Sequence, residues 1–103
     1  NRFAHVVHFV KENIRENIQL ESLAGQACMS KAHFSRTFKQ ELGMTPMEFV
    51  LKERLKLARQ YLLLESFQIQ EVCMLAGFNN ITYFIRAFKQ EFGCTPKSYM
   101  KYS

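Results

Sequence analysis

The chain has 103 residues, with fourteen Lys and Arg against nine Asp and Glu and a formal net charge of +5. This length suits a single domain with a modest core, and the positive charge favours a polyanionic partner, although that signal is weak alone. Three well-separated cysteines without a C-x-x-C pair argue against a disulfide framework or a zinc ribbon. No apolar run is long enough for a membrane span. We therefore expect a cytoplasmic protein.

Helical periodicity accounts for the whole chain, and no strand pattern is present. Ser30 is a suitable N-cap, and Pro46 and Pro96 follow threonines as first helical residues. Seven helices are expected, over residues 3–17, 20–27, 31–42, 47–64, 69–76, 81–92 and a short last segment from Pro96. Because the chain opens at Asn1, already close to a helical pattern, we expect it to be one domain of a longer protein.

An internal repeat organises these helices. The stretch 34–46 reads FSRTFKQELGMTP and the stretch 84–96 reads FIRAFKQEFGCTP, so nine of thirteen positions are identical in register. Upstream, residues 22–29 match 71–78 at an offset of forty-nine, so one residue has been added in the second connecting turn. The sequence predicts an all-α fold with two helix-turn-helix subdomains, residues 1–45 and 65–103, joined by a long linker helix over 46–64 within one domain.

The second helix of each copy has a distinctive outward face. Phe34 and Phe38 define the inward side of the first, and the opposite side is small, polar and basic. A helix of this kind, following a short helix and a tight turn, suits a major groove about 12 Å wide. Arg36 and Arg86 are suited to bidentate hydrogen bonding with guanine, and Lys39 with its counterpart Lys89 would reach phosphates.

Other interpretations of these residues remain open at this stage. The two arginines could be solvated, or could pair with Glu41 and Glu91. Ile85 is an outward β-branched residue that a thymine methyl group would cover, but a neighbouring domain or subunit would also cover it. His33 could donate to a phosphate or act in local capping.

The residues also match a family. The pattern L-A-x-x-x-x-M-S-x-x-x-F-x-R-x-F-K-x-E-x-G-x-x-P, then R-L-x-x-A-x-x-L-L at 54–63, then A-G-F-x-x-x-x-Y-F-x-R-x-F-K-x-x-F-G-x-x-P resembles the DNA-binding domain of AraC/XylS-type transcriptional regulators. The resemblance covers nearly the whole chain, and its most specific part is 76–96. Cys28 departs from the pattern, because a glycine often occupies that turn, as Gly77 does in the second copy.

The resemblance implies sequence-specific binding to double-stranded DNA by a bacterial transcription regulator, with the two recognition helices in successive major grooves. It implies base contacts from Ala32, Ser35, Arg36, Ile81, Thr82, Ile85 and Arg86. The residues expected at phosphates are Ser30, Lys31, His33, Lys39, Asn80 and Lys89. An N-terminal effector or dimerisation domain of the same chain and RNA polymerase are the further partners expected of such a regulator.

No catalytic constellation is present, so we expect no enzyme, no cofactor and no membrane partner. His5 and His8 are three residues apart, but no third ligand is evident, so no metal site is expected. The alternative function is a helical protein–protein interaction module without DNA binding. Two copies are few for a stacked solenoid, which argues against that alternative.

Overall fold

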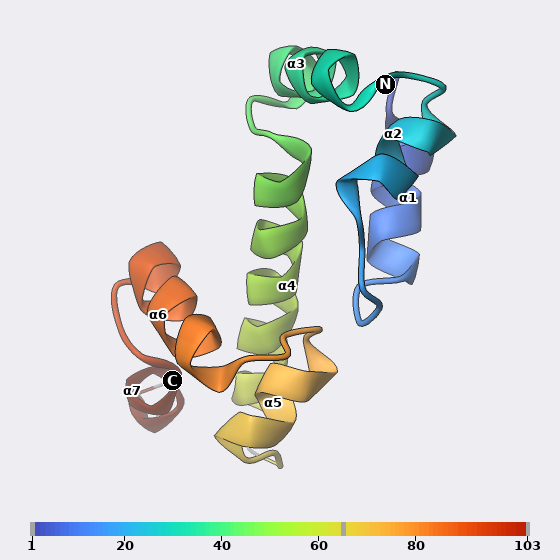
Figure 1. Cartoon of the computed structure of the whole chain (residues 1–103). Coiled ribbons are helices and arrows are strands. Elements are labelled where there is room, and N and C mark those ends of the chain that lie inside the picture. Colours follow the sequence, from blue (N-terminus) through green and yellow to red (C-terminus); the bar gives the residue numbers. More distant parts are fainter. Residues whose placement is uncertain (1, 65, 103) are drawn as a thin grey trace. The chain divides into compact units, whose positions relative to one another are not determined.

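The structure is a computed structural model that describes residues 2–64 and 66–102, with side chains as far as Met100 (Figure 1). The described residues form seven helices and no strand. The helices are α1 Ala4–Glu12, α2 Leu20–Gln26, α3 Lys31–Leu42, α4 Pro46–Leu63, α5 Ile69–Leu75, α6 Ile81–Phe92 and α7 Pro96–Tyr102. The all-α prediction is therefore confirmed. The chain divides into two compact units between Glu53 and Arg54, inside α4.

Most predicted helix boundaries agree with the structure within one residue, but the end of the first helix was wrong. Instead of continuing to residue 17, α1 ends at Glu12 and Asn13 is its C-cap. The side-chain amide nitrogen of Asn13 donates to the carbonyl oxygen of Phe9 at 2.9 Å, and the backbone carbonyl oxygen of Asn13 accepts from the backbone N–H of Glu16. Asparagine thus offers the backbone a turn in place of another helical hydrogen bond.

The first unit is built around a phenylalanine cluster. Phe3, Phe34 and Phe38 are fully buried, and each pair of their rings lies 5.4 to 5.5 Å apart between centroids. Such ring pairs contribute about 0.5–1.5 kcal/mol each beyond the area they bury. Valines of α1 and Val50 of α4 complete the buried cluster. The aromatic core therefore fixes the inward side of α3.

The second unit repeats this arrangement. Phe84 and Phe88 of α6 are fully buried, with ring centroids 5.9 Å apart, and Phe78 lies 4.8 Å from Phe84. At the end of α6, the Phe92 ring packs 4.6 Å from Phe88 and carries the guanidinium of Arg59 at 4.9 Å from its centroid. The repeated phenylalanines of the sequence thus hold α6 by the same side that holds α3.

Candidate nucleic-acid interface

The turn before each recognition helix has one hydrogen-bond pattern in both units. In the first, the N–H of Met29 donates to the carbonyl of Ala24 at 3.0 Å, and the N–H of Cys28 donates to Gly25. In the second, Phe78 and Gly77 make the equivalent bonds to Cys73 and Met74. This is the Schellman motif, in which the residue after the C-cap is left-handed.

Cys28 adopts the conformation that glycine favours. Its φ is +57°, and the φ of Gly77 at the matching place is +95°. The first turn thus carries a side chain where the second copy has glycine. The backbone keeps the same turn, so Cys28 bears the steric cost of a left-handed residue with a Cβ atom.

The added residue of the second copy is Asn79. In the first unit the N-cap Ser30 follows Met29 directly, whereas in the second unit Asn79 stands between Phe78 and the N-cap Asn80. Because Asn79 is exposed and lies between two fixed ends, it leaves the shared turn and the next helix start unchanged.

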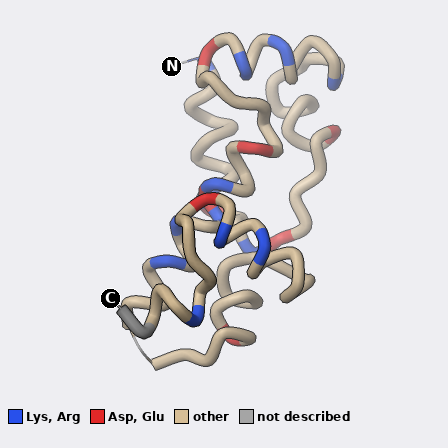
Figure 2. Tube along the Cα trace, turned by 90° about the vertical axis from the view of Figure 1, so that its left-hand side faces the viewer, with Lys and Arg blue, Asp and Glu red and all other residues tan. Residues whose placement is uncertain are grey.

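The outward face of α3 presents two cations, Arg36 and Lys39, beside small side chains. Arg36, Lys39 and Ala32 are exposed, and Ser35 between them is partly buried. Figure 2 shows the basic segments distributed along α3, the helix at the top of the view. Within the described part of the chain, Arg36 forms no ion pair, and the same holds for Arg86. The alternative in which Glu41 and Glu91 neutralise the two arginines is therefore not what the structure shows.

The outward face of α6 is less charged and more apolar. Thr82, Arg86 and Ile85 are exposed, Ile85 to 36%, and Ile81 is partly buried. Tyr83 is 48% exposed on the same helix and was absent from the sequence-based prediction. It is the counterpart of His33 in the repeat, and extending the fifty-residue offset one position would have revealed it.

The residues predicted at phosphates have structural roles as well. The Ser30 hydroxyl accepts from the backbone N–H of His33 at 3.2 Å, and the Asn80 side-chain oxygen accepts from Tyr83 N–H at 2.9 Å. Both residues are therefore N-caps that use a side-chain oxygen as the acceptor. The hydroxyl hydrogen of Ser30 and the amide N–H groups of Asn80 stay available as donors to a phosphate. His33 has an exposed side chain, as have Lys39 and Lys89.

Lys31 differs from the other cations because it has an acidic neighbour. Its Nζ lies 3.3 Å from Oε1 of Glu21, an exposed ion pair that joins α3 to α2. Exposed pairs of this kind contribute about 0–1 kcal/mol. Lys31 can therefore leave Glu21 to bind a phosphate at little cost, but the carboxylate lowers the net positive charge at the start of α3.

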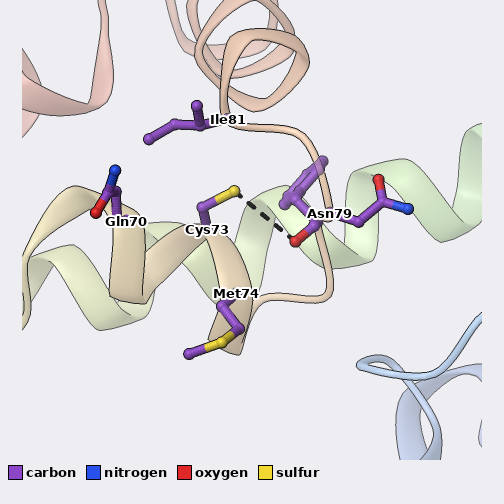
Figure 3. A pocket seen from close by; sticks show the side chains of 6 residues that line it. Gln70, Cys73, Met74, Asn79 and Ile81 are labelled. Atoms are coloured by element: carbon purple, nitrogen blue, oxygen red, sulfur yellow. Dashed lines mark hydrogen bonds between the residues drawn. The ribbon is translucent and has the colours of Figure 1, made fainter.

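The second unit has a pocket at the equivalent place. Ile81 and Gln70 replace Lys31 and Glu21, and a pocket of ≈ 360 Å³ opens there (Figure 3). Its lining residues are Gln70, Cys73, Met74, Phe78, Asn79 and Ile81. The Cys73 thiol donates to the carbonyl oxygen of Phe78 at 3.8 Å, and burial raises the pKa of this thiol. An uncharged, partly apolar recess thus adjoins the start of α6.

Comparison with known proteins identifies the fold. A family profile described as a helix-turn-helix domain matches residues 23–102, which is most of the chain. The chain belongs to the AraC-type helix-turn-helix family. Among the described residues, no helix is long and apolar enough to cross a membrane, and no group of three His, Cys, Asp or Glu is placed to hold a metal ion.

Curated relatives of this AraC-type domain are transcriptional regulators. The HTH-type transcriptional activator Btr of Bacillus subtilis is 35% identical over 94 residues, which are 91% of this chain and 18% of Btr. The bifunctional transcriptional activator/DNA repair enzyme AdaA of the same organism is 33% identical over 79 residues, which are 77% of this chain and 37% of AdaA. The chain spans well under two thirds of the length of these relatives.

Solved structures of the family superpose closely. The DNA-binding domain of the global transcriptional factor AdpA, in complex with a target DNA, has a TM-score of 0.91 at 27% identity, covering 98% of this chain and 91% of that one. An AraC-type transcriptional regulator from Chromobacterium violaceum has a TM-score of 0.87 at 28% identity, covering 97% and 89%. The paired helix-turn-helix units thus match domains from DNA-binding regulators.

Proposed function

We propose that this AraC-type domain binds double-stranded DNA sequence-specifically as part of a bacterial transcription regulator, with α3 and α6 in the major groove. The observation that carries the proposal is the pair of outward basic faces on two helices that the same turn and the same aromatic core position. Arg36 and Arg86 form no ion pair with described residues, so their guanidinium groups face solvent with donors to offer.

The remaining side chains divide by position on these helices. Ala32 and Ser35 on α3, and Ile81, Thr82 and Ile85 on α6, lie beside the arginines and complete the proposed base contacts. Backbone phosphates are assigned to Lys39 and Lys89 near the helix ends and to donors near the starts, namely Ser30, Lys31, His33 and Asn80.

The wider setting follows from the same proposal. Binding requires no catalytic step, so the domain acts without being an enzyme. The three cysteines are free, which suits the reducing cytoplasm. Effector or dimerisation functions belong to another part of the parent protein, and RNA polymerase is the partner through which such a regulator would act.

Selection from a random duplex library tests the function directly. We expect a shared sequence with two elements about ten base pairs apart, since neighbouring major grooves on one side of DNA recur every ~34 Å. Negligible affinity for duplex DNA at low salt would instead support the protein–protein interaction module.

Variants of Arg86 then test its role as a base reader. Arg86→Ala should weaken binding to the selected site by about 1–3 kcal/mol and leave binding to random DNA nearly unchanged. Arg86→Lys is the matched control, because it keeps the charge and removes the bidentate fork. If Arg86→Lys restores full affinity for the selected site, Arg86 acts as a point charge and reads no base.

A further inference from the structure

The two recognition faces differ most along one ridge of the helix. Positions four residues apart lie one above the other, so Ile81 and Ile85 form a ridge on α6, and Lys31 and Ser35 occupy the same ridge on α3. The α3 ridge begins with a cation paired to Glu21 at 3.3 Å. The α6 ridge carries no charge at either position.

This apolar ridge extends into the neighbouring pocket. Ile81 lines the ≈ 360 Å³ pocket together with Met74 and Phe78, and the side chain of Met74 is 66% exposed (Figure 3). Ile85, one turn later on α6, is 36% exposed. β-Branched residues are not favoured by helix propensity, so an exposed isoleucine does not stabilise the helix itself. The ridge is instead suited to contact with an apolar group.

Apolar groups on the major-groove edge of DNA are of one kind. Only thymine presents a methyl group there, at C5, whereas the other edges present hydrogen-bond donors and acceptors. Arg86 lies on the adjoining ridge and would read guanine beside such a methyl. Resting on the proposed function, we propose that α6 recognises thymine methyl groups through Ile85 and Ile81, so that the two units read chemically different half-sites.

Substitution of uracil for thymine tests this proposal on the DNA itself. Uracil lacks only the C5 methyl, so each thymine of the selected site can be replaced singly without changing base pairing. Burial of one methyl is worth about a fourfold change in affinity. We expect at least one thymine in one of the two elements to show this loss of affinity when it is replaced by uracil. As a control, replacing a cytosine of the site by 5-methylcytosine measures the effect of a methyl group at a base that Ile85 and Ile81 do not contact.

Variants assign the effect to the ridge. Ile85→Ser introduces the residue that α3 has at the matching place, Ser35. In this variant the ratio of affinities for the thymine and uracil sites should fall from about four to nearly one, whereas the matched variant Ser35→Ala should leave that ratio at about four. Circular dichroism of both variants checks that the helices remain formed. Ile85→Thr retains one methyl at the same place and should preserve part of the effect.

The outcomes separate this inference from the function on which it rests. Failure to select any site would overturn sequence-specific DNA binding. Selection of a site in which uracil weakens binding nowhere, or weakens it equally in wild type, Ile85→Ser and Ile81→Ser, would overturn methyl recognition by α6 and leave DNA binding intact.

Discussion

The left-handed cysteine of the first turn provides a quantitative test of the fold. Cys28 has φ +57° and an exposed side chain, so its thiol contributes little packing. A left-handed conformation costs an L-residue about 1–2 kcal/mol, and glycine removes that cost while losing about 0.5–1 kcal/mol through its freer unfolded chain. Cys28→Gly should therefore stabilise the protein by about 0.5–1 kcal/mol.

Thermal and urea unfolding followed by circular dichroism, in the presence of a reductant, measures this gain. A change of about 1 kcal/mol corresponds to roughly 4–8 °C in Tm for a unit of this size, so a rise of a few degrees is expected. Cys28→Ser keeps the Cβ atom and removes the thiol, and it should give no gain. Gly77→Ala adds a Cβ atom at φ +95° and should destabilise. Equal stability of the glycine and serine variants would refute the reasoning from left-handed strain.

Three further predictions concern charge, pH and the core. Lys39→Ala should lower the slope of log affinity against log salt by about 0.9, because one phosphate contact is lost; an unchanged slope contradicts that contact. The backbone N–H of Thr45 bonds Glu48 at 2.9 Å and, with the Thr45 hydroxyl, lowers the pKa of Glu48 from 4.5. The ionised Glu48 carboxylate therefore stabilises the folded state at pH values above its unfolded pKa, and this contribution is lost as the pH falls through its pKa in the folded state. Glu48→Gln should therefore reduce the difference in urea midpoint between pH 7 and pH 3, and an unchanged difference would count against a stabilising hydrogen bond from Thr45 to Glu48. Phe84→Ala removes a fully buried ring and should cost about 3–5 kcal/mol in urea unfolding, whereas a loss below 1 kcal/mol would mean that the ring is not part of the core.

Local signals explain why the recognition helices were predicted so closely. The N-caps Ser30 and Asn80 mark the starts of α3 and α6, and the left-handed glycines Gly43 and Gly93 mark their ends. Each signal involves only residues close in the sequence. Such bonds depend on the adjacent sequence alone, and the repeat supplies the same signal twice.

The wrong end of the first helix and the unpredicted ion pair of Lys31 depend on competition or on contacts across the fold. The apolar periodicity continues beyond Glu12, and it gives no sign that the Asn13 side chain bonds the carbonyl oxygen of Phe9 and ends the helix. Likewise the pairing of Lys31 with Glu21 requires α2 and α3 to be placed first. Tyr83, by contrast, could have been predicted as exposed, because it occupies the place of His33 in the repeat.

The division of α3 and α6 into a buried side and an exposed side has a consequence for how such a protein changes over generations. Phe34, Phe38, Phe84 and Phe88 determine whether the units fold, and none of them is accessible to a ligand. The residues proposed to read DNA lie on the other side, where replacement usually alters stability by no more than about 0.5 kcal/mol. Selection can therefore retune one operator element at a time, since a new preference in either helix requires no compensating change in the core.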